Sequence, residues 1–125
     1  MRFFRRLLPA ALALLSFALP GSALGQAPLS PDKAFALTVT READGDLAFA
    51  WDIAPGHYLY RDHTVASTPG GKESLPLELA AGETKDDPGF GVVDVWHDAG
   101  RATLSAQTLT QAGEPTSVHI TYQGG

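Results

Sequence analysis

Hydrophobic and polar residues alternate with a period of two along most of the chain that follows its apolar amino-terminal segment. This alternation is typical of β-strands that bury one face and expose the other. The clearest runs cover residues 35–39 and 47–53, and Asp44 and Gly45 between them are a strong signal for a hairpin turn. The same alternation predicts further strands over residues 57–65, 75–79, 92–98, 101–109 and 117–122.

Turn-forming residues separate these runs and set how they are expected to connect. Pro76 marks the run 75–79 as an edge strand or the end of one, because proline cannot donate a hydrogen bond to a sheet. Residues 81–91 are mostly polar and are predicted to form a long loop that carries Phe90 near its end. Ala99 and Gly100 are predicted to turn the strand 92–98 back onto 101–109 as its partner.

The number and spacing of these runs indicate the fold class. About seven short strands recur at roughly ten-residue intervals, a pattern of antiparallel sandwiches. No segment of residues 26–125 repeats its apolar positions with helical periodicity over several turns. We therefore predict an all-β fold, an immunoglobulin-like antiparallel β-sandwich, although the Cys…Trp…Cys signature of true immunoglobulin domains is missing.

The first residues have the layout of a cleavable secretory signal peptide. Arg2, Arg5 and Arg6 form a basic region, an apolar run covers residues 7–19, and small residues follow. Cleavage is predicted before Gln26, so that residues 1–25 are the signal peptide and residues 26–125 form one domain. A membrane anchor is the alternative, but the apolar run is too short to span a bilayer comfortably. We therefore expect an exported protein.

Charge and cysteine content narrow the range of functions. Loss of the three arginines of the signal peptide would leave six of the nine basic residues against 14 acidic residues, a formal charge of −8. An acidic surface argues against nucleic acid and anionic membranes as partners. The chain contains no cysteine, which excludes cysteine chemistry and thiolate metal sites within these 125 residues.

Four histidines raise the question of a metal site. Zinc or copper requires three or four ligands that converge, and the sequence has neither an H-x-H pair nor an HExxH motif. Two of the histidines would share a face of the strand 57–65 but lie about 20 Å apart at ordinary strand rise. We therefore expect no metal and no cofactor, and we expect surface or rim positions for His57, His63, His97 and His119.

Other polar motifs fit loops better than sites. Glu83, Asp86 and Asp87 lack the spacing of a calcium-binding EF-hand loop and are expected to be solvated. The glycines of residues 68–72, TPGGK, lack the spacing of a phosphate-binding loop and are expected to form a turn. The chain has no GxSxG motif, so a hydrolase has no motif behind it.

Three aromatic residues are candidates for a binding surface. Strand alternation would send Tyr58 and Tyr60 to one face of residues 57–65, and His57 and His63 to the other face. Phe90 lies in a segment that contains glycine and proline. Aromatic rings with a polar tip suit sites that are buried at one end and wet at the other. Core packing of one tyrosine and anchoring of the loop by Phe90 are the alternative to a binding site.

Three segments together resemble the N-terminal periplasmic domain of the DsbD family of thiol:disulfide interchange proteins. They are W-x-I-x-x-G-x-Y-L-Y-R at residues 51–61, an acidic-aromatic-glycine loop at residues 87–91, and T-Y-Q-G at residues 121–124. Each segment is weak alone, but their order and spacing carry the resemblance, which extends over residues 35–124. The resemblance implies the same immunoglobulin-like sandwich that the strand count predicts.

The resemblance also implies a protein-disulfide reductase system in the periplasm. In the family, this domain takes electrons from a membrane domain of the same protein and passes them to periplasmic thiol-disulfide proteins, which include disulfide isomerases and the cytochrome c maturation pathway. A pair of cysteines carries the electrons, and Gly125 stands at or just before the position of the first cysteine. By the resemblance, the residues around this pair are Tyr58, Tyr60, Asp87, Phe90 and Tyr122.

Two hypotheses follow from the missing cysteines. In the first, the chain is an amino-terminal piece of a DsbD-type reductase that stops before its cysteine pair and lacks the last strand or strands of the sandwich. DNA beyond codon 125 would then encode the pair. In the second, the chain is a redox-inert periplasmic module that binds a protein partner through Tyr58, Tyr60 and Phe90. In both cases we expect no thiol:disulfide exchange by these residues alone, because they contain no thiolate.

Overall fold

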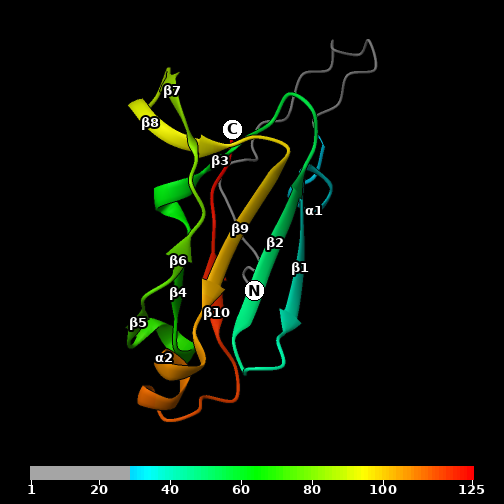
Figure 1. Cartoon of the computed structure of the whole chain (residues 1–125). Coiled ribbons are helices and arrows are strands. Elements are labelled where there is room, and N and C mark those ends of the chain that lie inside the picture. Colours follow the sequence, from blue (N-terminus) through cyan, green and yellow to red (C-terminus); the bar gives the residue numbers. More distant parts are fainter. Residues whose placement is uncertain (1–28) are drawn as a thin grey trace.

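The computed structural model describes residues 29–125, so the predicted signal peptide and its cleavage site lie outside the described residues. The described chain consists mainly of short β-strands (Figure 1). The strands are β1 (Phe35–Arg41), β2 (Leu47–Ile53), β3 (Leu59–Tyr60), β4 (Val65–Ser67), β5 (Ser74–Leu75), β6 (Glu78–Leu79), β7 (Glu83–Asp87), β8 (Gly91–Trp96), β9 (Ala99–Leu104) and β10 (His119–Thr121). The helical elements are α1 (Pro31–Ala34), α2 (Ala106–Gln111) and the 3₁₀ turns η3 (Arg61–His63) and η4 (Pro69–Gly71).

The strands form one larger and two smaller antiparallel sheets. The larger sheet has the order β1–β2–β9–β6, and the smaller sheets have the orders β10–β4–β5 and β3–β8–β7. The chain after β10 connects the two smaller sheets, because Gly124 bridges to Leu59 and the backbones of Gly125 and Tyr58 exchange hydrogen bonds of 2.9 Å and 3.2 Å. The chain end therefore runs beside β3, where Figure 1 marks the C-terminus.

A hydrophobic core lies between the larger sheet and the smaller ones. Trp51 of β2 is fully buried, and its ring stacks on Phe49 and on Trp96 of β8, with centroid distances of 6.3 Å and 5.8 Å. Leu59 and Leu104 are also fully buried, from β3 and β9 respectively. Burying a side chain of this size contributes about 1.5–3 kcal/mol. The core therefore joins the sheets into an antiparallel β-sandwich, as the alternation of the sequence predicts.

The two clearest local predictions are confirmed. β1 and β2 form an antiparallel hairpin whose turn contains Gly45 at φ +95°, a backbone conformation that favours glycine. The run around Pro76 is divided between β5 and β6, and each of these is the edge strand of a different sheet. Local turn chemistry was sufficient for both predictions, because each depends on the backbone of one or two residues.

The single strand predicted over residues 57–65 is wrong. The extended run stops after Tyr60, because η3 makes a 3₁₀ turn, and Val65 begins β4 in a different sheet. A 3₁₀ helix has three residues per turn, so residues i and i+3 lie above one another. His63 therefore lies on the side of Tyr60 and not on the opposite face, with the two ring centroids 5.4 Å apart.

The long loop predicted over residues 81–91 is also wrong. Its central residues form β7, which makes a hairpin with β8 in which Glu83 lies opposite Val95 and Asp87 lies opposite Gly91. The turn that was predicted at residues 99 and 100 lies earlier, at His97 and Asp98, and Asp98 has φ +63°. This bend carries the chain from one sheet to another, so β9 pairs with β2 and β6 and not with β8.

The strand predicted to run to residue 109 ends at Leu104, and the helix α2 follows. Ser105 is the N-cap, and its Oγ accepts a hydrogen bond of 3.1 Å from the backbone N–H of Thr108. A helix of six residues is too short to show a helical period in the sequence. Within residues 29–125, no helix has the length and apolar character needed to cross a membrane.

Gly100 provides a test of the packing between β9 and β8. A Cβ atom at this position would lie 2.6 Å from Cε3 of the buried Trp96 ring. We expect Gly100→Ala to lower the free energy of unfolding by about 1–3 kcal/mol in urea denaturation, because the overpacked ring must move. Thr38→Ala, on the exposed face of β1, should change this free energy by less than about 0.5 kcal/mol. Equal midpoints for the two variants would contradict the packing.

Candidate functional site

Two tyrosines that are two residues apart point their hydroxyl groups at one carboxylate. Tyr58 lies just before β3 and Tyr60 ends it, so the extended backbone places both side chains on the same face. Their hydroxyl groups donate hydrogen bonds to Oδ1 of Asp87, with oxygen–oxygen distances of 2.5 Å and 2.7 Å. The two rings meet edge to face, with 5.4 Å between centroids. The prediction that the two tyrosines share a face is confirmed.

Asp87 is a buried carboxylate at the end of β7, and only 4% of the residue is exposed. Its Oδ2 accepts hydrogen bonds of 2.8 Å and 2.9 Å from the backbone N–H groups of Gly89 and Phe90. The carboxylate therefore joins the two tyrosines to the turn between β7 and β8. The prediction that this acidic run is solvated is wrong for Asp87, whereas Glu83 and Asp86 are exposed.

These hydrogen bonds set the protonation states of the three side chains. Donation from Tyr58 and then from Tyr60 holds the pKa of the Asp87 carboxyl well below its ordinary value of 3.8. Burial, and then the hydrogen bond to Asp87, raises the pKa of each tyrosine above 10.0. At neutral pH the site thus contains a charged acceptor and two neutral donors. A carboxylate with so low a pKa is poorly suited to proton transfer near neutral pH and acts here by holding its neighbours in place.

Phe90 covers one side of the tyrosine pair. Its ring meets the rings of Tyr60 and His63 edge to face, with centroid distances of 4.9 Å and 4.8 Å. Because its backbone N–H is bound to Asp87, the position of this ring depends on the same carboxylate. The residue is 48% exposed, so it presents an aromatic surface to solvent. We refer to Tyr58, Tyr60, His63, Asp87 and Phe90 as the aromatic cap.

Tyr58 has two further neighbours at the edge of the aromatic cap. Nζ of Lys85 lies 4.8 Å from the centroid of its ring, within the range of a cation–π contact. The His97 ring lies 5.9 Å away, and its Nδ1 is 2.7 Å from Oε1 of Glu83. The pairing of β7 with β8 brings these residues together, so the strand misread as a loop also supplies part of the site.

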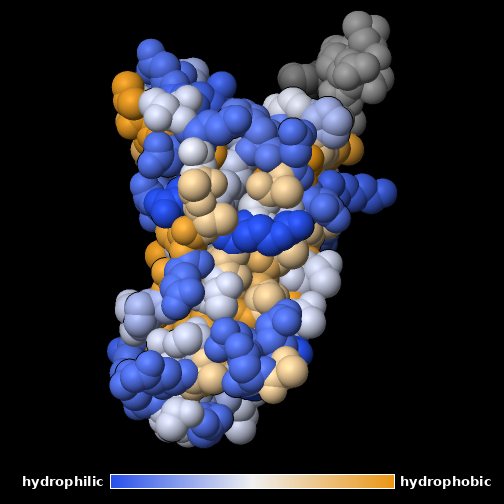
Figure 2. All heavy atoms as spheres, viewed as in Figure 1, coloured by the Kyte–Doolittle hydropathy of each residue, from blue (hydrophilic) through white to orange (hydrophobic). Residues whose placement is uncertain are grey.

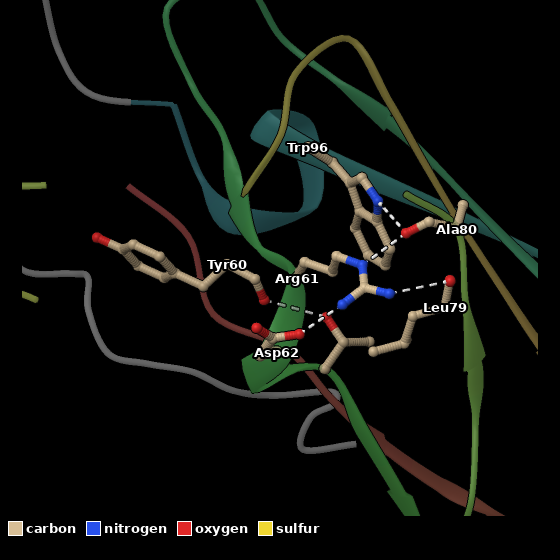
Figure 3. A network of polar contacts seen from close by, with 7 residues as sticks. Tyr60, Arg61, Asp62, Leu79, Ala80 and Trp96 are labelled. Atoms are coloured by element: carbon tan, nitrogen blue, oxygen red, sulfur yellow. Dashed lines mark hydrogen bonds and ion pairs between the residues drawn. The ribbon is translucent and has the colours of Figure 1, made fainter. Parts of the chain in front are cut away.

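Arg61 fixes the backbone where the chain leaves β3 (Figure 3). Its Nε donates a hydrogen bond of 2.7 Å to the carbonyl oxygen of Ala80, and its Nη2 donates one of 3.2 Å to that of Leu79. Trp96 donates through Nε1 to the same Ala80 oxygen at 3.2 Å. Nη1 of Arg61 lies 2.7 Å from Oδ1 of Asp62. This network ties η3, which directly follows Tyr60 of the aromatic cap, to the end of β6 and to Ala80 after it.

The last residues of the chain lie against Tyr58. A Cβ atom at Gly124 would lie 2.7 Å from the carbonyl oxygen of Tyr58 and would also overlap the Phe35 ring, so this approach requires glycine. A Cβ atom at Gly125 would lie 2.7 Å from both Oη and Cζ of Tyr58. Position 125 is therefore next to a hydroxyl group that is bound to Asp87.

The structure brings together four of the five site residues named from the resemblance. Tyr58, Tyr60, Asp87 and Phe90 are in contact, whereas Tyr122 is half-buried and its ring lies against Trp51, with a centroid distance of 5.5 Å. Sequence reasoning missed the parts played by three further residues, which are His63, Lys85 and His97. For His63, the signal was the i, i+3 spacing from Tyr60 that a 3₁₀ turn creates. For Lys85 and His97, there was no signal in the sequence, because their position depends on the register of β7 and β8.

The histidines are dispersed over the molecule. His63 and His97 border the aromatic cap, the His57 ring meets that of Phe35 at 5.7 Å, and His119 is exposed in β10. Over the range 29–125, no group of three or more histidine, aspartate or glutamate side chains is placed to hold a metal ion. The aromatic cap combines hydrogen-bond donors, a fixed charge and aromatic rings at one surface of the domain.

Comparison with known families shows which family the chain belongs to. The family model described as "Thiol:disulfide interchange protein DsbD, N-terminal" matches residues 25–124. The chain belongs to the DsbD N-terminal domain family. Curated relatives from Cronobacter sakazakii, Actinobacillus pleuropneumoniae and Haemophilus influenzae, each named thiol:disulfide interchange protein DsbD, are 33%, 37% and 38% identical over 93, 97 and 98 residues. These alignments cover 74–77% of this chain but only 15–16% of each relative.

Solved structures of DsbD N-terminal domains share the fold. The reduced form of the Neisseria meningitidis domain matches with a TM-score of 0.62 and 22% identity, over 86% of this chain and 79% of that chain. The domain in complex with the N-terminal domain of PilB from the same organism matches with a TM-score of 0.57 and 27% identity, over 78% of this chain and 73% of that chain. The fold is thus the immunoglobulin-like antiparallel β-sandwich predicted from the sequence.

Replacement of Asp87 tests its role in this DsbD-type domain. Asp87→Asn keeps the shape of the side chain, but its NH₂ group cannot accept the hydrogen bonds that one carboxylate oxygen receives. We expect a lower urea midpoint than for Asp86→Asn, the neighbouring exposed residue, and tyrosine ionisation at lower pH in an ultraviolet absorbance titration. Indistinguishable variants would show that Asp87 does not hold the aromatic cap.

The contribution of Asp87 to stability should also depend on pH. Its folded-state pKa lies below the ordinary value of 3.8, so its contribution is fully present above that value and is lost as the pH falls towards the folded-state pKa. The difference in stability between the native chain and Asp87→Asn should therefore shrink in acid below about pH 4. A difference that stayed constant or grew in acid would contradict the charged form of the carboxylate.

Proposed function

We propose that this domain serves a periplasmic thiol:disulfide interchange system and that the aromatic cap is its recognition and shielding surface. The observation that carries the proposal is the set of four hydrogen bonds that the Asp87 carboxylate accepts. Two come from the tyrosine hydroxyl groups and two from the turn that holds Phe90. An aromatic lid over a polar, water-restricted pair suits a site that must admit one protein partner and exclude others. The membership in the DsbD N-terminal family supports the same role.

In the proposed reaction, a thiolate attacks a partner's disulfide and forms a mixed disulfide, and a second thiol then displaces the partner in its reduced form. Two electrons pass to the partner, and the donor pair becomes a disulfide. The 125 residues contain no cysteine, so both thiols would have to come from outside them. The contact of Gly125 with Tyr58 supports a location for this chemistry beside the aromatic cap.

The proposed partners are periplasmic thiol-disulfide proteins on one side and a DsbD-type membrane domain on the other. The solved complex between a DsbD N-terminal domain and the PilB N-terminal domain supports another protein domain as a partner. Export to the periplasm, a link to cytochrome c maturation and cleavage before Gln26 are parts of the same proposal. Their support is the basic and apolar layout of the amino-terminal sequence and the family membership.

A redox-inert binding module is the second candidate. The aromatic cap is complete although the chain has no cysteine, so recognition of a protein partner needs no thiol chemistry from these residues. In this function the domain would hold its partner without electron transfer. An activity assay and a binding assay together separate the two functions.

We expect the purified chain alone to give no turnover in an insulin-reduction assay with dithiothreitol as the electron source, after subtraction of the uncatalysed rate. The reason is that no thiolate is available to attack the insulin disulfides. A DsbD N-terminal domain with its cysteine pair serves as the positive control. Turnover above the uncatalysed rate would contradict the prediction.

Binding of the PilB N-terminal domain tests recognition by the aromatic cap. Titration calorimetry should detect a complex that is weakened about tenfold or more by Phe90→Ala, since truncation of an aromatic anchor costs at least about 1.4 kcal/mol at a hot spot. Val39→Ala is the control, because Val39 is similarly exposed, at 50%, on β1. Equal losses for both variants, or binding unchanged by Phe90→Ala, would place recognition elsewhere on the domain.

A further inference from the structure

One edge of β8 is only partly paired. The edge towards β7 is paired from Gly91 to Val95. On the opposite edge, β3 is the paired strand, and it reaches only Val95 and Trp96. Within residues 29–125, no strand pairs with residues 91–94 on that side. An unpaired strand edge presents backbone N–H and C=O groups and is a ready template for a strand from another chain.

A hollow of about 260 Å³ lies at this open edge. Its walls come from β8 and the facing residue Thr84 of β7 on one side, and from the end of β3 and η3 on the other, so it also reaches over the face of the β7–β8 hairpin. The residues that line it are Tyr60, Asp62, His63, Thr84, Val92, Val93 and Asp94. Because Tyr60 and His63 belong to the aromatic cap, the hollow is continuous with that surface. The open edge of β8 and the cap therefore adjoin each other, and β8 lies at the end of the molecule opposite the turn between β1 and β2 (Figure 1).

The side chains beside the open edge combine an apolar group with negative charge. Val92 is 73% exposed, and the register of β7 and β8 places Asp86 opposite Val92 and Thr84 opposite Asp94 on the same face. Among the described residues, neither Asp86 nor Asp94 forms an ion pair with a basic side chain, whereas Asp62 is paired with Arg61. Figure 2 shows apolar atoms among hydrophilic ones at this end of the molecule, near β7 and β8.

We propose that the open edge of β8 binds an extended, basic segment of a partner protein by strand addition. Backbone groups of residues 91–94 would pair with the segment, and its alternate side chains would meet Val92 or enter the hollow. Lysine or arginine suits the second position, because an aliphatic stem can lie along Val92 and Tyr60 while the charged end reaches Asp94. The charges at the edge favour this occupant over an acidic or neutral segment.

The outer edge of β7 is a poorer site for the same interaction. Its sequence, ETKDD, is almost entirely charged or polar and includes the exposed Glu83 and Asp86. Charged side chains on an edge strand oppose pairing with a further strand. The open edge of β8 has Val92 and Val93 beside a single charged residue, Asp94, and it borders a hollow. The inference goes beyond the proposed function, since it depends on neither a cysteine nor the PilB domain.

A capped seven-residue peptide in which lysine and valine alternate is the probe. On titration into the ¹⁵N-labelled chain, we expect the amide resonances of residues 91–94 to shift and their hydrogen exchange to slow, because their backbone groups become paired. Replacing the central valine with proline should abolish binding, since proline removes a backbone donor and restricts the backbone of a strand. Replacing the lysines with glutamates should also abolish it.

Protein variants test the charge at the edge. Asp94→Lys should weaken binding of the lysine–valine peptide about threefold to fivefold, the upper part of the range for exposed charge pairs. Glu42→Lys makes the same charge change at the exposed end of the β1–β2 hairpin and should weaken it by less than about twofold. Strand addition is refuted by equal binding of the proline or glutamate peptide, by shifts confined to other strands, or by no binding at about 1 mM peptide. None of these results depends on insulin reduction or on PilB binding, so failure of this inference leaves the proposed function untouched.

Discussion

The carboxylate of Asp87 is the interaction on which the site depends. A buried charge is costly unless hydrogen bonds replace its lost hydration, and here two tyrosine hydroxyl groups and two backbone N–H groups do so. Each donor comes from a segment that must be correctly folded to reach it. The carboxylate therefore couples β3 to the turn after β7, and it keeps two tyrosines neutral and oriented while it stays charged itself.

This coupling explains how a surface turn can hold the Phe90 ring of the aromatic cap in place. Phe90 has no deep pocket of its own and is half exposed, so its position depends on the backbone bond to Asp87 and on edge-to-face contacts with Tyr60 and His63. Contacts of this kind contribute about 0.5–1.5 kcal/mol each. The Phe90 ring is therefore held by a few contacts of modest energy and not by deep burial.

The sandwich contributes by placing three distant segments side by side. The chain after β10 pairs with β3, and β3 pairs with β8, so the last glycines, the tyrosine pair and the β7–β8 hairpin meet at one end of the core (Figure 1). Trp96 of β8 connects this end to the core. Its ring stacks on Trp51, and its Nε1 donates to the Ala80 carbonyl oxygen that Arg61 also binds. The site is thus an extension of core packing to the surface.

The sequence alone determined the features that depend on local periodicity and turn chemistry. These are the all-β fold class, the β1–β2 hairpin and the shared face of Tyr58 and Tyr60. It did not predict the burial of Asp87, which looks like one of several acidic residues in a polar run, because burial depends on donors 27 and 29 residues away in the chain. It also placed His63 on the wrong face, since η3 replaces a period of two with a period of three. Which strand β8 pairs with, and hence which of its edges is open, was decided only by the tertiary structure, because pairing is a competition between non-local contacts that no single segment records.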